Sequence, residues 1–238
     1  MTLPSTLVNQ MQALTVQKPK TPPLFKAPTS IAESITTLLR DRLAVGYYPP
    51  GSWIRESALA EEFKVSNGPV REALQTLVNE GLLEREPWKG VRVVSLSDDE
   101  IVEIFQLRLG LQELAAELAA RNATAEQVAE ARVLLAEMDD VLKRGDIEAQ
   151  MPIGRQLSIW LCLCSGNSRL EETWTRLTYQ TRMYIYESLR QSKNLAYITT
   201  LWLELVNAIE QRDSQRAREA ARNLTRRALD DLGLTLGL

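Results

Sequence analysis

The stretch Ser66-Asn67-Gly68-Pro69-Val70-Arg71-Glu72-Ala73-Leu74 has the pattern of a helix that begins at its first residues. Serine is a preferred N-cap, because its hydroxyl accepts a hydrogen bond from a free amide of the first turn. Proline is tolerated in that turn, since those amides have no partner within the helix. Val70, Ala73 and Leu74 recur at helical spacing and would pack inward. Arg71 falls on the outward side, where a recognition helix meets base edges.

The flanking sequence predicts the rest of a winged helix. Glu56–Phe63 is a short helical pattern, and Lys64-Val65-Ser66 connects it tightly to the next helix, which predicts a helix-turn-helix. Ser30-Ile31-Ala32-Glu33 is a capping box that opens an earlier helix. Residues 83–94 have the composition of two short strands joined by the turn Pro87-Trp88-Lys89-Gly90. Three helices followed by a β-hairpin make a winged helix-turn-helix.

These residues resemble the winged-helix domain of the GntR family of transcriptional regulators, over residues 30–95. The family pattern is met at Pro50-Gly51, Leu59-Ala60, residues 65–74, Glu80-Gly81-Leu82 and Gly90. Arg71 matches the base-reading arginine of the family, and Gly90 matches the glycine at the wing tip. Two positions depart from the pattern: Asn67 stands where an arginine usually follows the serine, and Ser57 stands where some members have an arginine.

The resemblance and the chemistry of these side chains predict a set of DNA contacts. Arginine suits guanine because its fork can donate to O6 and N7 together, and asparagine can cap the helix, contact a phosphate or read adenine. For Arg71 the alternative is a surface salt bridge with Glu72 or Glu80, and basic residues at the edge could be merely solvated. The predicted contacts are Arg55, Ser57, Lys64, Ser66, Asn67, Gly68, Pro69, Arg71, Lys89 and Gly90.

Length and charge favour two domains behind a flexible arm. The chain has 238 residues, and its net charge is −3. Residues 1–97 hold 11 of the 28 basic and 9 of the 31 acidic residues, so DNA binding would depend on a local positive face. The Pro-, Thr- and Gln-rich residues 1–28 predict a flexible arm rather than a signal peptide. No apolar run approaches membrane-spanning length, so we expect a cytoplasmic protein with no membrane partner.

Residues 98–238 predict an all-helical bundle, so the fold class is mainly α with a small β-hairpin wing. Capping patterns at Ser97 and Thr124, a break at Ser165-Gly166-Asn167 and a cap at Asp213 divide this part into six helices. In the first helix, we expect one apolar stripe to be the continuous buried face, because its members step by three and four residues. The stripe consists of Ile104, Leu107, Leu111, Leu114 and Leu118.

This second part resembles the FCD effector domain that follows the winged helix in one large GntR subfamily. The matching residues are Arg108, the run from Leu114 to Ala120, Ser165-Gly166-Asn167 and Arg212-Asp213. Six helices rather than seven resemble the shorter form of that domain. The resemblance implies a homodimeric regulator of a metabolic operon that is controlled by a ligand.

The chain has no histidine, which bears on the metal that many FCD domains hold through one aspartate and three histidines. Counted from Ser165-Gly166-Asn167, the aspartate position falls at Gly154 and the first histidine at Ser158. The others fall near Trp202 and residues 223–224. None of these side chains is a ligand of comparable strength for zinc, nickel or iron. We therefore predict no metal and no cofactor.

Two interpretations of the bundle remain open. In one, a cavity binds a small organic effector directly, and convergent arginines favour a carboxylate or phosphate group. In the other, aromatic side chains fill the space and the bundle is only a dimerisation core. The candidate effector-binding residues are Arg108, Gly154, Ser158, Arg182, Trp202 and Asn223. Cys162 and Cys164 are expected to be buried thiols rather than a disulfide or a metal site, because their spacing turns them apart on a helix.

The sequence thus predicts a DNA-binding transcriptional regulator and not an enzyme, and the family resemblance favours a repressor. Without histidine there is no Ser-His or Cys-His pair, and no phosphate-binding glycine motif is present. The expected partners are an inverted-repeat operator in double-stranded DNA, a second copy of the chain and a small organic effector. The alternatives are a constitutive DNA binder with a filled effector site, and a partner-binding dimer that has lost specific operator binding.

Overall fold

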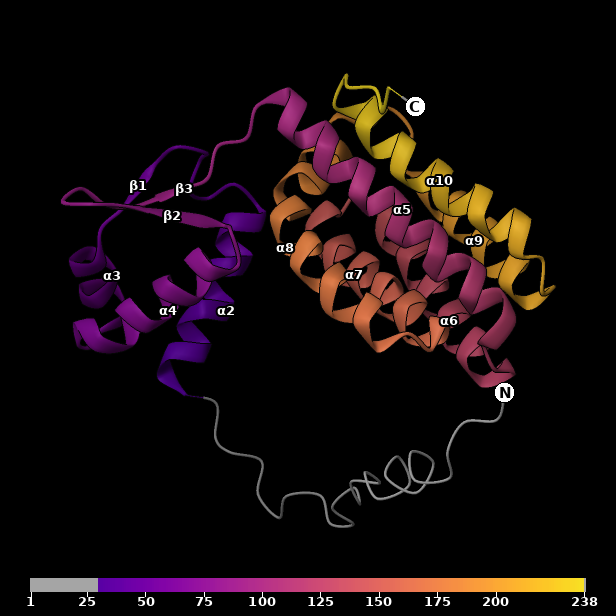
Figure 1. The fold of residues 1–238 in the computed structure, drawn as a ribbon, viewed down its shortest axis with the longest axis horizontal. Helices are drawn as coiled ribbons and strands as arrows, with labels where there is room; N and C mark the ends of the chain where they lie inside the picture. The colour runs from indigo at the N-terminus through magenta and orange to yellow at the C-terminus, as the bar shows by residue number, and fades with distance from the viewer. Residues whose placement is uncertain (1–29, 238) are drawn as a thin grey trace, which may run out of the picture. The chain divides into compact units, whose positions relative to one another are not determined.

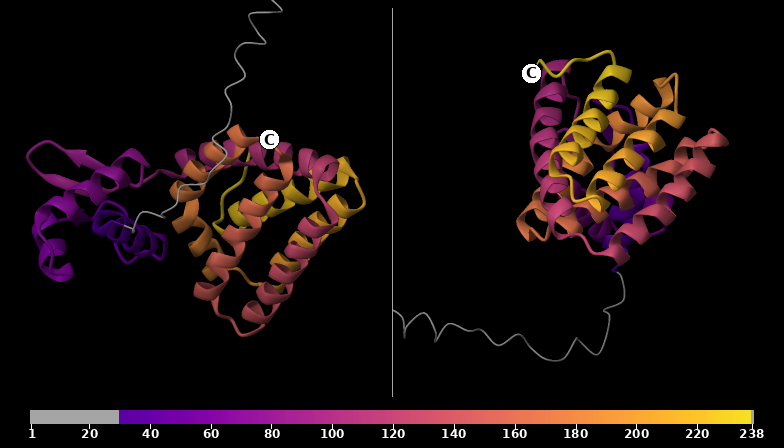
Figure 2. Two further views of the ribbon diagram at one scale, coloured as in Figure 1. Left: turned by 90° about the horizontal axis from the view of Figure 1, so that it is seen from below. Right: turned by 90° about the vertical axis from the view of Figure 1, so that its right-hand side faces the viewer.

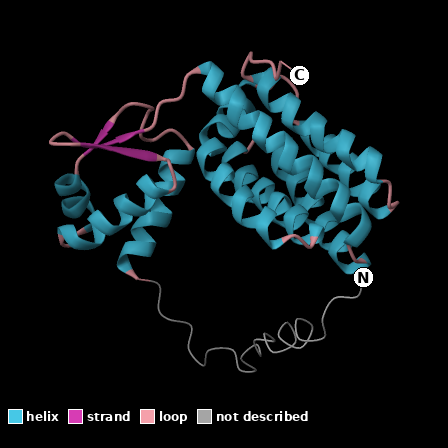
Figure 3. Cartoon of the chain, in the orientation of Figure 1, coloured by secondary structure: helices cyan, strands magenta, loops and turns pink. Residues whose placement is uncertain are grey.

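The computed structural model describes residues 30–237, so the expectation for the arm at residues 1–28 lies outside the described residues. It confirms the mainly α fold, with a winged helix-turn-helix followed by a helical bundle (Figures 1 and 3). The elements of the winged helix are α2 (Ile31–Ala44), β1 (Trp53–Ile54), α3 (Glu56–Phe63), α4 (Asn67–Asn79), β2 (Leu83–Glu86) and β3 (Gly90–Val93).

Helix α4 packs as its sequence pattern predicts. Val70, Ala73, Leu74 and Leu77 are fully buried and form the centre of the winged-helix core. The N-cap is Ser66, but its side chain makes no capping hydrogen bond, so the expected hydroxyl cap is wrong. The third helical position is Pro69, which has no N–H to donate to a capping oxygen.

The wing contains one strand more than the sequence predicted. β2 and β3 form the expected antiparallel hairpin, in which Glu86 pairs with Gly90 across the turn. β1 adds a third strand, and the sheet order is β1-β3-β2. Its two residues are too few to show a strand periodicity, and the register comes from distant partners, with Trp53 opposite Arg92.

The six helices predicted for residues 98–238 are all present, and we call them together the bundle. They are α5 (Asp98–Asn122), α6 (Ala125–Lys143), α7 (Ile147–Ser165), α8 (Ser168–Gln191), α9 (Ala196–Glu210) and α10 (Ser214–Asp231). Both predicted capping boxes form, with Ser97 facing Glu100 and Thr124 facing Gln127. Asp213 caps α10 by accepting from the amide of Arg216. No helix within residues 30–237 is long and apolar enough to cross a membrane.

The predicted buried face of α5 is wrong. Leu107 and Leu114 are exposed, at 62% and 42%, and the other three members of that stripe are only partly buried. The face that packs inward instead carries Phe105, Arg108 and small alanines such as Ala116. Alanines allow close helix packing, so the larger leucines are left on the outside of this single chain.

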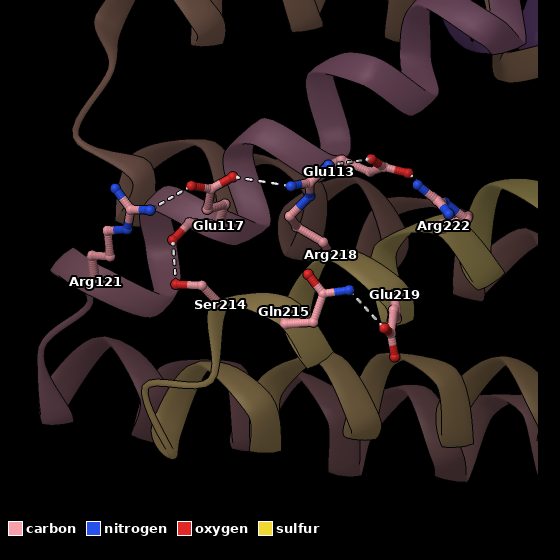
Figure 4. Close-up of polar contacts among 8 residues, drawn as sticks. All are labelled: Glu113, Glu117, Arg121, Ser214, Gln215, Arg218, Glu219 and Arg222. Atoms are coloured by element: carbon pink, nitrogen blue, oxygen red, sulfur yellow. Dashed lines mark hydrogen bonds and ion pairs between the residues drawn. The ribbon is translucent and has the colours of Figure 1, made fainter.

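Helix α5 lies alongside α10, and the views in Figures 1 and 2 agree on this arrangement. A charged cluster ties the two helices together, as Figure 4 shows. Arg222 Nε donates to Glu113 Oε1 over 2.6 Å, and Arg218 bridges Glu113 and Glu117. Burial acts to raise the pKa of Glu113, but these two arginines outweigh it and hold the pKa below its ordinary value.

Candidate functional site

Five of the ten predicted DNA contacts line one groove of the winged helix. The groove is open and is lined by Arg55, Ser57, Asn67, Lys89 and Gly90, which come from α3, α4 and the wing. Five further predicted residues lie at the start of α4 or in the turn before it. Of these, Lys64, Ser66, Gly68 and Arg71 are exposed and Pro69 is partly buried. The structure therefore brings the ten residues onto neighbouring elements; their contact with DNA stays a prediction.

Arg71 is oriented by a carboxylate that the sequence did not single out. Its Nε donates to Glu56 Oε2 over 3.1 Å, whereas the expected alternative partner Glu80 pairs with Arg40 instead. The side chain of Arg71 is 67% exposed. Because the contact with Glu56 uses Nε, both Nη groups remain available for a base edge.

The wing tip carries an aromatic side chain that sequence reasoning missed. Trp88 is fully exposed and has a positive φ of 68°, in the turn between β2 and β3. An aromatic residue in a hairpin turn is too far from the core to be buried, and its place in the turn was the signal in the sequence that Trp88 is exposed. Next to it, Lys89 pairs with Glu86 over 2.9 Å, which leaves the lysine accessible at the mouth of the groove.

The bundle encloses a cavity of about 100 Å³ between helices α5, α7, α8, α9 and α10. Five of the six candidate effector-binding residues line it: Arg108, Gly154, Ser158, Arg182 and Trp202. Asn223, the sixth candidate, does not line the cavity. Its side chain is exposed, and the next residue on α10, Leu224, faces the cavity instead. The resemblance to the family gave that position only as residues 223–224, and one residue on a helix turns the side chain by about 100°.

Arg108 is the buried charge of this cavity. Its Nη1 donates to Thr181 Oγ1 over 2.7 Å, and its guanidinium stacks over Trp174 at 4.5 Å. None of the ion pairs among residues 30–237 includes Arg108, although the residue is only 8% exposed. Burial lowers the pKa of Arg108 to about 10, because no neighbouring anion compensates for the lost water.

Three other residues of the cavity lining each carry a buried polar atom without a hydrogen-bond partner, and the sequence did not single out these residues. Gln150 Oε1, Thr178 Oγ1 and Arg227 Nε are buried without a hydrogen bond. Buried polar groups are normally satisfied, so these atoms are donors and acceptors that a bound ligand or water could use. The signal in the sequence was spacing, because Gln150, Gly154 and Ser158 recur every four residues on α7.

The residues at the metal position of the family do not fit a metal. Gly154, Ser158, Trp202 and Leu224 surround the cavity and offer one hydroxyl, which donates to the carbonyl of Gly154 over 2.9 Å. Within residues 30–237 no group of three His, Cys, Asp or Glu side chains could hold a metal ion. The chemistry of this cavity is therefore that of arginine, amide and hydroxyl groups in an apolar wall.

The two cysteines are both free and buried in α7, as the sequence predicted. Burial raises the pKa of Cys162 and of Cys164 to about 12. Both thiols are therefore protonated at neutral pH, and the thiolate that would serve as a nucleophile or metal ligand is absent.

The fold and the groove define a class of protein, the winged helix-turn-helix DNA-binding regulators with an added helical domain. The chain belongs to the GntR family: residues 31–93 match the model for bacterial regulatory proteins of the gntR family, and residues 103–227 match the FCD domain. It is thus a transcription regulator rather than an enzyme. Its FCD domain is of the kind that binds small-molecule effectors.

Individual relatives agree with this assignment. The chain is 28% identical over 196 residues to the HTH-type transcriptional regulator McbR of Escherichia coli, covering 79% of this chain and 86% of McbR. It is 37% identical over 89 residues to the gluconate operon transcriptional repressor of Bacillus subtilis, covering 37% and 35% of the two chains. The solved structure of E. coli McbR/YncC has the same fold, with a TM-score of 0.73 at 24% identity, covering 83% of this chain and 94% of that one.

Proposed function

We propose that this protein binds an inverted-repeat operator as a homodimer and represses a metabolic operon until a small organic anion occupies the bundle. The observation that carries the DNA half of the proposal is Arg71, exposed at the start of α4 and held through Nε by Glu56. A guanidinium with both Nη groups free suits the O6 and N7 atoms of guanine. Repression is favoured because a relative that matches part of this chain is named as an operon repressor.

The exposed leucines of α5 support the homodimer. Leu107 and Leu114 lie two turns apart on one face of the helix, and each exposes more than two fifths of its surface. A continuous apolar stripe on a surface marks a site that another protein surface covers. A two-fold dimer presents the same patch from both subunits, and it would place two winged helices on two half-sites.

Arg108 supports an anionic effector. A buried arginine without a carboxylate partner is costly, and an anion from outside would supply that partner through charge-assisted hydrogen bonds. The cavity wall includes four arginines and no acidic residue, which excludes a cationic ligand on electrostatic grounds. Of these arginines, Arg182 and Arg227 already have carboxylate partners. Of the other two, Arg155 is exposed to solvent, so Arg108 is the one buried guanidinium of the wall without a carboxylate partner, which fits a monoanion.

The cavity volume limits the size of that anion. An apolar cavity of about 150 Å³ holds benzene. A cavity of about 100 Å³ therefore suits an acid of roughly four to six non-hydrogen atoms. The apolar part of the lining, with Ile185 and Leu189 of α8 among its members, would contact a short carbon chain. An open cavity of this composition also argues against a constitutive regulator whose effector site is filled by aromatic side chains.

The test is a selection of duplexes from random sequence with the purified full chain. We expect enrichment of an inverted repeat whose half-sites contain guanine, because two copies of Arg71 would read the same base in each half. A selected duplex should bind far more tightly than an unrelated one at the same salt concentration. Enrichment of a single unrepeated half-site would refute the homodimeric operator complex. Recovery of random sequence would refute specific DNA recognition and favour the partner-binding alternative.

A further inference from the structure

One arginine of the bundle faces the cavity and also contacts the winged helix. Arg182 lines the cavity together with Thr178, which lies one turn earlier on α8. Its Nη1 donates to Asp41 Oδ1 over 2.9 Å, and Asp41 belongs to α2, the first helix of the winged helix. A change of partner at Arg182 would therefore alter both the cavity wall and the contact with α2.

The neighbours of Arg182 on α8 also pack against the winged helix. The ring of Tyr179 lies beneath the guanidinium of Arg40, at 4.4 Å. Gln180 lies against Gly81, where an added Cβ would come within 2.5 Å of the Gln180 amide nitrogen. These four residues and Arg182 also line a second, smaller hollow. The segment from Tyr179 to Arg182 is thus the part of α8 that connects the cavity wall to α2.

We propose that an anion in the cavity draws Arg182 away from Asp41 and so releases α2 from α8. The proposal rests on the proposed function, because it gives the route by which the effector would act on DNA binding. In the ligand-free arrangement the ion pair fixes α2 against the bundle and favours the operator-binding orientation. In the occupied arrangement the guanidinium turns to the anion, and Asp41 returns to water.

The electrostatics of the two partners favour this exchange. The side chain of Asp41 is 57% exposed, so solvent screens its attraction to Arg182 and its release costs little. Arg182 is 14% exposed, and an anion inside the cavity would be shielded from water on most sides. The attraction between opposite charges is stronger where water is excluded. Arg182 has an acceptor in both arrangements, Asp41 without ligand and the anion with it, so its buried charge is paired in each.

A carboxylate built into the cavity tests the proposal without knowledge of the effector. Thr178 is four residues before Arg182, and a glutamate at that spacing pairs well with a following arginine. The hydroxyl of Thr178 is buried and has no hydrogen-bond partner, so Thr178→Glu would place a carboxylate at the cavity wall. Thr178→Gln is the matched neutral variant. We expect Thr178→Glu to bind a selected operator at least about fivefold more weakly than Thr178→Gln, as measured by fluorescence anisotropy.

A double-mutant cycle assigns that difference to the ion pair. Asp41→Asn removes the partner of Arg182, so the Glu-to-Gln difference at position 178 should shrink below about twofold in that background. Glu62→Gln serves as control, because Glu62 of α3 pairs with Arg42 of α2, and no ion pair among residues 30–237 joins Glu62 to α8. In the Glu62→Gln background the full difference should remain. Equal affinities of the two Thr178 variants, or a difference that persists in Asp41→Asn, would overturn the proposal.

Hydrogen exchange gives a readout that does not depend on DNA. Both Thr178→Glu and Asp41→Asn should speed the exchange of amides in α2, residues 31–44, relative to Thr178→Gln. Unchanged exchange in both variants would overturn the proposal. If Thr178→Glu fails to fold, Gly154→Asp against Gly154→Asn places the same charge from α7, where an added Cβ meets the ends of two flexible side chains, Gln150 at 3.0 Å and Met138 at 3.9 Å. Wild-type protein that binds no sequence selectively would refute the proposed function instead.

Discussion

Replacing Arg71 with alanine should abolish base selectivity at one position of each half-site and weaken operator binding by about 1–3 kcal/mol per contact. The physical reason is the loss of the two donors that fit the O6 and N7 acceptors of guanine. The stability of the protein should change little, because the contact with Glu56 involves an arginine that is 67% exposed. Competition between duplexes that differ at single positions, followed by fluorescence anisotropy, measures the effect.

Arg85→Ala provides the matched control, because Arg85 shares the same carboxylate. Its Nη1 donates to Glu56 over 3.3 Å, but it lies on strand β2 rather than at the start of α4. We expect it to weaken all duplexes by a similar, small factor and to leave base preference unchanged. If Arg71→Ala lost affinity uniformly across duplexes as Arg85→Ala does, Arg71 would contact phosphate and the assignment of the base-reading residue would be wrong.

Replacing Arg108 with methionine should stabilise the fold and abolish the response to the effector. The fall of the pKa of Arg108 from its ordinary value to about 10 corresponds to a cost of about 3 kcal/mol for holding the charge at neutral pH. Stacking on Trp174 is lost in the variant and offsets part of the gain. The net gain should be about 1–2 kcal/mol, which raises the thermal midpoint by roughly 2–8 °C. Differential scanning calorimetry without ligand measures it.

The difference in stability between Arg108→Met and the wild type should decrease as the pH rises above about 10. The pKa of Arg108 is lower in the folded state, so the unfolded chain binds more protons between about pH 10 and its ordinary value. The cost is therefore fully present at neutral pH and fades only in strong alkali. Arg108→Lys keeps the charge and loses the planar fork, and it should be no more stable than the wild type. A lower midpoint for Arg108→Met than for the wild type would show that the charge is compensated within the native protein.

Local signals in the sequence were enough to predict most of the fold. The caps at Ser97, Thr124 and Asp213 marked helix starts because capping depends on residues three positions apart. Strand β1 was missed because two residues carry no periodicity, and its partner Arg92 is far along the chain. The apolar stripe of α5 was placed in the core because periodicity identifies an apolar face but does not say whether the same chain or another surface covers it.

The candidate site was predictable where it follows a motif and not where it depends on packing between helices. Arg71 was identified from its place in a local pattern, and its actual partner Glu56 was missed because α3 and α4 meet only in the folded protein. In the bundle, the family pattern located Arg108 and Ser158. It missed Gln150 and Arg227, whose role appears only when α7 and α10 close around one space. The candidate Asn223 is one residue before Leu224, which lines the cavity.

The measurement that tests the central claim most directly is release of a selected operator duplex by short organic acids with metal removed. Fluorescence anisotropy would follow wild type and Arg108→Met in EDTA, with sodium acetate, propionate, lactate and pyruvate, against sodium chloride at equal ionic strength. We predict that at least one acid releases the wild type in EDTA and that Arg108→Met stays bound. Release that needs an added divalent metal, release that is equal in Arg108→Met, or no release by any acid would contradict an arginine-held, metal-free effector site.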